Sequence, residues 1–256
     1  METNYCAEYV IGAKQHPHTL NAVRFIESAV KFRLPVGGKL IDIKPKSNAI
    51  LQYKTTFQDY ISELKLPFDT VVLEFCCEDI VFVVMAANGF DNSIVFSYRY
   101  RARENKIRWY SSKGSIKIKA DSFEVSKSLE INEDYGDNDN QVLDRVSVTL
   151  LSFVAALQCS NVKMVDETAP IKLNKSRIKK GKQPFFDYKV LTIDTKGKPE
   201  QSKSKGCISR TSTRVHLRRG HIRRLEHKTV WVNPCVVGDK SKGMVTKDYR
   251  ILGDFD

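Results

Sequence analysis

The sequence predicts an α+β fold: an antiparallel sheet with two or three helices packed on one face, followed by a basic, β-rich C-terminal region. Five runs rich in Val, Ile and aromatic residues follow one another between residues 70 and 120. Turn residues separate these runs, which is typical of an antiparallel meander. Stretches with apolar residues at helical spacing flank the meander, and the last third of the chain is strongly basic.

Three segments are expected to be helical. In residues 19–33 the apolar side chains recur at helical spacing, and Thr19 can cap the first turn. Residues 55–66 favour a second, short helix. The strongest apolar face lies in residues 141–158, after a cap at Asp139 or Asn140, and it should lie on the sheet.

The strands of the meander are expected to alternate with short turns. A short strand is also expected earlier, over residues 39–43. The five runs of the meander are 70–75, 80–87, 93–100, 106–111 and 115–120. The turns between them are expected at Asn88-Gly89, Asp91-Asn92 and Lys113-Gly114. The run 80–87 is continuously apolar, which predicts a central strand covered on both faces.

Composition shifts near residue 170, which predicts an α+β domain over residues 1–170. A basic β-rich region over 171–256 follows and can pack on the first. Residues 171–256 hold 22 Lys and Arg against 8 Asp and Glu, whereas residues 1–170 hold 20 against 22. Such asymmetry indicates a polyanionic partner for the last third. Strands are expected there over 185–193 and in a hairpin over 215–237, bent at Gly220 with its turn at 226–228.

The stretch 210–227 concentrates six arginines and three histidines. The planar guanidinium stays charged and makes paired hydrogen bonds to phosphate, so this cluster predicts phosphate contacts with DNA or RNA. Lysine-rich segments nearby suit a more diffuse attraction to the backbone. The residues assigned to nucleic-acid binding are Arg214, Arg218, Arg219, His221, Arg223, Arg224, Lys179, Lys180 and Lys182.

Other chemistries remain open beside this non-enzymatic interpretation. An endoribonuclease could use His216 or His221 as a base beside the arginines. Zinc could use Cys207, His216, His221 and Cys235, but their spacing matches no standard finger, so neither a metal nor another cofactor is expected. The basic tail could also bind an acidic host protein as an inhibitor. Oligomeric state cannot be inferred from these patterns.

The hydropathy pattern predicts a cytoplasmic protein that does not enter a membrane. No run of about 18 uncharged apolar residues occurs that could span a bilayer. The N-terminal residues lack the basic and then apolar order of a secretory signal.

Three C-terminal segments carry recognisable motifs: HLRRGHIRRL (216–225), KTVWVNPCVVG (228–238) and KGMVTKDYRIL (242–252). The motifs are an R-G-H-x-R core, a V-W-V-x-P strand and a final K-x-Y-R strand. In this order they resemble a module found in an uncharacterised family of small phage and mobile-element proteins. LPFDTVVLEF (66–75) is similar to a proline-aromatic strand of the same proteins. The resemblance implies a phage origin and the host cytoplasm, and it supplies no catalytic residues.

Overall fold

The computed structural model describes most of the first two thirds of the chain and parts of the last. The described residues are 4–14, 16, 19–40, 53–54, 61, 63–104, 108–119, 122–127, 139–194, 214–218, 221–232, 235–237 and 239–244. Its helices are α1 (Tyr5–Ala13), α2 (Leu20–Ser28), α3 (Asp139–Leu157) and α4 (Ile171–Lys179). Its strands are β1 (Val30–Arg33), β2 (Tyr53–Lys54), β3 (Thr70–Cys77), β4 (Ile80–Asn88), β5 (Ser93–Ala102), β6 (Tyr110–Lys119), β7 (Ser122–Lys127), β8 (Val162–Glu167), β9 (Tyr188–Ile193), β10 (Arg214–Arg218), β11 (His221–Arg224), β12 (Thr229–Val232), β13 (Cys235–Val237) and β14 (Asp239–Met244).

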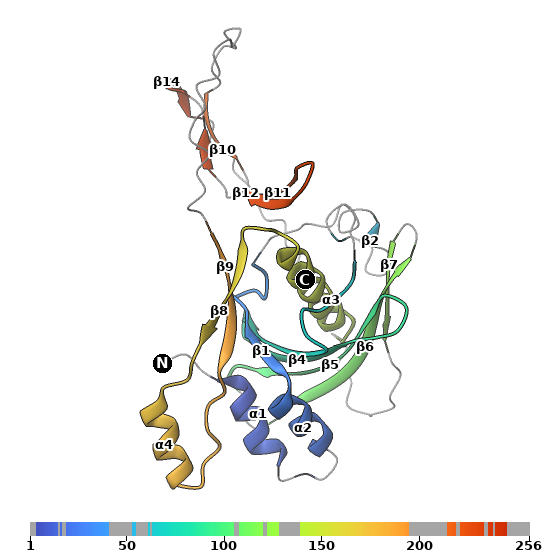
Figure 1. Cartoon of the computed structure of the whole chain (residues 1–256), viewed down its shortest axis with the longest axis vertical. Helices are drawn as coiled ribbons and strands as arrows, with labels where there is room; N and C mark the ends of the chain where they lie inside the picture. The colour runs from blue at the N-terminus through green and yellow to red at the C-terminus, as the bar shows by residue number, and fades with distance from the viewer. Residues whose placement is uncertain are drawn as a thin grey trace.

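The α+β class is confirmed, with one large sheet as its centre (Figure 1). Nine described strands form this sheet in the order β2-β7-β6-β5-β4-β3-β1-β9-β8. Strands β3 to β6 form the predicted antiparallel meander, in which the predicted runs 106–111 and 115–120 fall in the single strand β6. Strand β7 extends the meander and was not predicted. The expectation of a wholly antiparallel sheet is wrong at β1, which pairs in parallel with both β3 and β9.

The error at β1 arises from a change of period within the predicted helix 19–33. The helix ends at Ser28, and Ala29 is already extended with ψ at 155°. From Val30 onward the chain is a strand with Phe32 on one face and Lys31 on the other. Val23, Ile26 and Val30 fit a helical spacing, so the four residues of the strand were assigned to the end of the predicted helix.

Helices cover both faces of the sheet, so the expectation that they share one face is wrong. Helix α3 packs on one face, in a core with Phe82 and Val84 of β4. Helices α1 and α2 pack on the other face, in a second core with Val83 and Met85. The prediction that this strand is central and covered on both sides is therefore confirmed.

One predicted turn is absent because β6 runs unbroken through Gly114. Gly114 lies opposite Phe96 of β5, and an added Cβ would come within 2.7 Å of the Phe96 Cζ. The glycine therefore makes room for an aromatic ring and does not make a turn. Two other expectations lie largely outside the described residues: most of the strand 39–43 and residues 55–60 of the helix 55–66. The described end of that predicted helix, residues 61 and 63–66, is not helical.

Part of the predicted C-terminal region belongs to the same sheet and core. Strand β9 pairs with β1 and β8. Strands β11 and β12 form a hairpin with its turn at the predicted residues 226–228, and Ile222 of this hairpin is buried in the core beside α3. The division at residue 170 stays a prediction. No helix in the described ranges is long and apolar enough to cross a membrane.

Candidate nucleic-acid interface

The most basic described feature is the excursion between β8 and β9, which contains α4. Residues 168–186 hold six Lys and Arg and no Asp or Glu. In Figure 1 this excursion extends from one end of the β8–β9 pair, away from the sheet and α3. The sequence pattern predicted no helix here, because Pro170 and Pro184 suggested broken structure and apolar residues are few.

Helix α4 forms because both of its ends are well defined. Pro170 is the N-cap, and its carbonyl accepts the first helical bond, from the N–H of Asn174 at 3.0 Å. At the other end Gly181 takes the left-handed conformation with φ at 64°. The N–H groups of Gly181 and Lys182 donate to Ile178 and Arg177 oxygens, both at 2.9 Å, which is a Schellman motif. The Lys-Gly pair at 180–181 was the signal in the sequence for this helix end.

The exposed face of α4 carries a row of three lysines, Lys172, Lys175 and Lys179, hereafter the lysine row. They occupy positions i, i+3 and i+7, with Ser176 between them, and all are exposed. At about 1.5 Å rise per residue, the row spans roughly 10 Å along the helix axis. No residue of α4 is buried, and within the described ranges no carboxylate pairs with the row. The row is therefore a set of unneutralised cations that the fold does not use for packing.

The opposite face of α4 is fixed by the returning segment. The Asn174 side chain makes two hydrogen bonds to the backbone of Phe185, at 2.9 and 2.8 Å. Arg177 donates to the Gln183 carbonyl at 2.7 Å, and its guanidinium lies 4.2 Å from the Phe185 ring centroid. Lys14 of the N-terminal region donates to the Gln183 side chain at 2.9 Å. These contacts hold the helix in one orientation, so the lysine row is preorganised.

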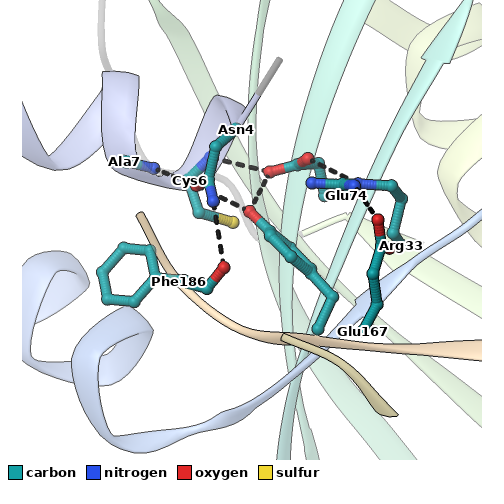
Figure 2. Close-up of polar contacts among 8 residues, drawn as sticks. Asn4, Cys6, Ala7, Arg33, Glu74, Glu167 and Phe186 are labelled. Carbon is teal, nitrogen blue, oxygen red and sulfur yellow. Dashed lines mark hydrogen bonds and ion pairs between the residues drawn. The ribbon is translucent and has the colours of Figure 1, made fainter. Parts of the chain in front are cut away.

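Both connections of the excursion are also tied to the core, as Figure 2 shows. On the β8 side, Glu167 accepts from Arg33 at 2.8 Å. On the β9 side, the Phe186 carbonyl accepts from the Asn4 side chain at 3.1 Å. Across the base, the Ala169 N–H donates to Asp187 at 2.7 Å.

A buried carboxylate lies at the centre of this anchoring cluster. Glu74 of β3 is 1% exposed and accepts from the Cys6 N–H at 2.8 Å and from the Tyr188 hydroxyl. The Tyr188 hydroxyl also lies 2.8 Å from Asn4 Oδ1 and can donate to either oxygen. The position of Glu74 at the N-terminus of α1 suits a negative charge. Burial nevertheless raises the pKa of Glu74, while the hydrogen bonds and Arg33, 3.5 Å away, act in the opposite direction.

The chemistry of this cluster indicates positioning and not catalysis. It contains a thiol, a phenol and a carboxyl group, but Cys6 is 0% exposed and Tyr188 is 3% exposed. Burial raises the pKa of the Cys6 thiol well above its ordinary value and also raises the pKa of Tyr188. Both groups therefore stay protonated at neutral pH, and neither is accessible to a substrate. Their hydrogen bonds join α1, β3 and β9 beneath the basic excursion.

The structure places the predicted nucleic-acid residues in two separate parts of the molecule. Lys179, Lys180 and Lys182 lie exposed at the end of α4. Arg223 and Arg224 are exposed on β11, which Figure 1 shows at the other end of the β8–β9 pair from α4. The structure does not bring these two sets together in one chain. Lys172 and Lys175 belong to the basic C-terminal region but were not among the assigned residues, because their alignment with Lys179 depends on a helix that was not predicted.

The other predicted residues lie wholly or partly outside the described part of the chain. Arg214, His216 and Arg218 belong to β10, and His221 of β11 lies opposite Val232. Their side chains, the whole of Arg219 and the zinc candidate Cys207 lie outside what the structure describes, as does the side chain of Cys235. The ribonuclease and zinc alternatives therefore stay as the sequence left them.

The hairpin of β11 and β12 is attached to the core by an asparagine. Asn161, between α3 and β8, accepts from the Trp231 N–H at 2.8 Å and donates to the Trp231 carbonyl at 2.9 Å. The Ser160 N–H adds a bond to the Thr229 carbonyl at 2.8 Å. Trp231 is partly buried and packs against the core beside α3. Arg223 and Arg224 are thereby held on an anchored hairpin.

The chain matches no protein-family model, no curated protein and no solved structure. The resemblance of the C-terminal segments to phage proteins therefore stays a prediction.

Proposed function

We propose that the protein binds nucleic acid without cleaving it, and that the lysine row of α4 contacts consecutive phosphates. The observation that carries this proposal is an ordered, anchored helix whose exposed face holds cations that no described carboxylate neutralises. A fold gains no core packing from such a helix. A polyanion supplies the missing counter-charge, and counterion release drives its binding.

The geometry favours contacts with the backbone and not with bases. Lysine ammonium groups are point charges, which position a phosphate strand but do not read a base edge as a guanidinium fork does. The row spans roughly 10 Å on the helix rise, and phosphates of one strand of a duplex advance about 3.4 Å along its axis. This length covers several phosphates of one strand, so each of the three lysines can contact a different one. Binding through α4 is expected to be independent of sequence, and both DNA and RNA fit it.

The arginines of the basic β-rich C-terminal region form a second contact in this proposal. Arg223 and Arg224 are exposed on a hairpin whose other side is anchored through Asn161. A phage or mobile-element origin, with action in the host cytoplasm, rests on the C-terminal resemblance. Small basic proteins in that setting have abundant nucleic acid as a partner.

The test is an anisotropy titration with labelled 20-nucleotide single strands and duplexes of DNA and RNA. It is done in EDTA at 50 mM salt, after nuclease treatment and high-salt purification. Reversing the lysine row (Lys172→Glu, Lys175→Glu, Lys179→Glu) should weaken binding by more than tenfold, because three phosphate contacts become repulsive. A control with the same charge change elsewhere, Lys65→Glu, Lys113→Glu and Lys117→Glu, should weaken binding far less. Equal losses in both variants would show that net charge, and not α4, governs binding.

The same samples separate binding from cleavage. Labelled RNA should stay intact in EDTA. Cleavage that His216→Ala or His221→Ala abolishes would replace the proposed function by ribonuclease activity. Absence of binding at 50 mM salt would reject nucleic acid as the partner and favour the alternative of a host-protein ligand.

A further inference from the structure

Strand β8 forms an exposed edge of the large sheet. It pairs with β9 on one side and is the last strand in the sheet order. Its side chains from Lys163 to Asp166 are exposed, including Met164 at 45% and Val165 at 46%. Two apolar residues at half exposure, on opposite faces of an edge strand, favour pairing with another strand.

The free backbone groups of this edge can be assigned from the ladder. The Asp194 N–H donates to the Asn161 carbonyl at 2.7 Å, and Val162 lies opposite Ile193. In an antiparallel ladder the bonded positions alternate, so 161, 163, 165 and 167 bond to β9. The N–H and C=O groups of Met164 and Asp166 therefore point away from β9, toward the edge at which no described strand pairs with β8.

The charges of β8 are self-complementary in one register. When two copies of β8 pair antiparallel about a two-fold axis, residues directly opposite each other must have side chains on the same face of the sheet. Among the registers that meet this condition, two pair five residues of β8 in each copy. The register centred on Met164 sets Lys163 opposite Val165. The register centred on Val165 sets Lys163 opposite Glu167, twice, around a Val165–Val165 contact. Registers centred on Lys163 or Asp166 place like charges opposite each other, which is destabilising.

We propose that β8 pairs with β8 of a second copy in the register centred on Val165, which joins the two sheets into one. Met164 and Asp166 exchange backbone hydrogen bonds across the axis. Lys163 and Glu167 lie at non-bonded positions, where facing side chains come closest. Each already has a partner within its own chain: Lys163 pairs with Asp194 at 2.6 Å, and Glu167 with Arg33 at 2.8 Å. Pairing of two copies places Lys163 of one copy beside Glu167 of the other. Each of the two resulting rows then has four charges of alternating sign, from Asp194, Lys163, Glu167 and Arg33.

This arrangement would unite the two separated basic elements. Within one chain, α4 follows the end of β8, and the β11–β12 hairpin is attached at residues 160–161, just before its start. Antiparallel pairing centred on Val165 brings residue 161 of one copy opposite residue 169 of the other. The lysine row of one copy then lies at the same end of the joined strands as the hairpin of the second copy. This consequence rests on the proposed function, whereas the pairing itself does not.

The test is a charge exchange followed by sedimentation velocity at 0.15 M salt, without nucleic acid. A pairing edge of five residues is small, so wild-type association should become visible on the order of 10–100 µM protein. Lys163→Glu and Glu167→Lys should each raise the dissociation constant about tenfold or more, because each places like charges opposite each other twice. An equimolar mixture of the two variants should restore dimers, since every Glu then faces a Lys.

Two further variants keep the result decisive. Met164→Pro removes an outward N–H without breaking a bond to β9, so it should leave the fold intact and abolish association. Lys65→Glu, with the same charge change on an exposed site, should associate like wild type. Circular dichroism confirms the fold of each variant.

Three outcomes would overturn the proposal: a wild type that is monomeric at 200 µM, a folded Met164→Pro variant that dimerises normally, or a mixture that stays monomeric. A failure of nucleic-acid binding would leave all of these measurements unchanged, so the two proposals fail separately.

Discussion

Replacing Glu74 by Gln tests whether burial or charge pairing dominates in the anchoring cluster. The carboxylate accepts from the Cys6 N–H and the Tyr188 hydroxyl through the same oxygen, Oε2. A glutamine oxygen in that place keeps both donors. Its amide group then faces Arg33, which still has Glu167 at 2.8 Å. The burial-dominated upward shift in the pKa of Glu74 means that the fold favours the neutral form. We therefore expect Glu74→Gln to lie within about 1 kcal/mol of wild type at pH 7, or to be more stable.

Glu74→Ala should behave differently, because it removes the acceptor and not only the charge. The buried Cys6 N–H would lose its side-chain partner, at a cost of about 1–3 kcal/mol, and a cavity would add to that loss. The sum is about 3–5 kcal/mol, similar to breaking a buried ion pair. The exposed Glu63→Gln serves as a control with little effect.

The pH dependence of stability is an independent test of the direction in which the pKa of Glu74 is shifted. Since the pKa of Glu74 is raised in the folded state above its ordinary value of 4.5, the folded protein binds more protons between the two values. The stability of wild type relative to Glu74→Gln should therefore fall as pH rises through that window and stay level above it. Urea unfolding followed by tryptophan fluorescence at pH 4 to 8 measures this difference. The reasoning is refuted if Glu74→Gln loses as much unfolding free energy as Glu74→Ala at pH 7. It is also refuted if the stability of wild type relative to Glu74→Gln increases as pH rises.

The further predictions concern the lysine row, two glycines and Asn161. Alanine at all three lysines of the row should reduce the slope of log affinity against log salt by about 2–3, measured by anisotropy; an unchanged slope would remove these lysines from the contact. Gly114→Ala should lose about 1–3 kcal/mol in thermal unfolding, because its Cβ would meet Phe96 at 2.7 Å. Gly12→Ala, with open space in α1, should instead be stabilising by about 0.5–1 kcal/mol. Asn161→Ala should release the β11–β12 hairpin to limited proteolysis while the main unfolding transition persists; equal protection would show that Ile222 burial alone holds the hairpin.

The sequence predicted the meander and α3 because each element has one uniform pattern of apolar residues along its length. Strand β4 is apolar at every position from 81 to 86 and lies between two cores, so its continuous run was informative. Helix α3 carries one long apolar face, which marks it clearly. Gly114 misled because a glycine that admits a neighbouring ring looks the same in sequence as a glycine in a turn.

Only the basic composition of the candidate site could be predicted, not the arrangement of its side chains. The basic excess of the last third was visible, and Lys179, Lys180 and Lys182 lie where it is exposed. The lysine row was not visible, because α4 has no apolar face and its stability comes from Asn174 and the glycine end. The cluster around Glu74 depends on contacts between residues 4–6, 74 and 186–188, which no local pattern reports.

The placement of β1 between β3 and β9 has a consequence for biosynthesis. The first strand of the sheet leaves the ribosome before either neighbour, and the bond between Asn4 and Phe186 joins residues 182 positions apart. At about 5–20 residues per second, roughly 10–30 s separate the synthesis of β1 from that of β9. During that interval the edge of β1 that pairs with β9 has no partner, and Glu74 lacks the hydrogen bond from Tyr188. The segment with Asn4 and β1 is thus made well before β9 and is among the last parts to be secured, and a nascent chain stalled before residue 188 leaves the edge of β1 that faces β9 unpaired.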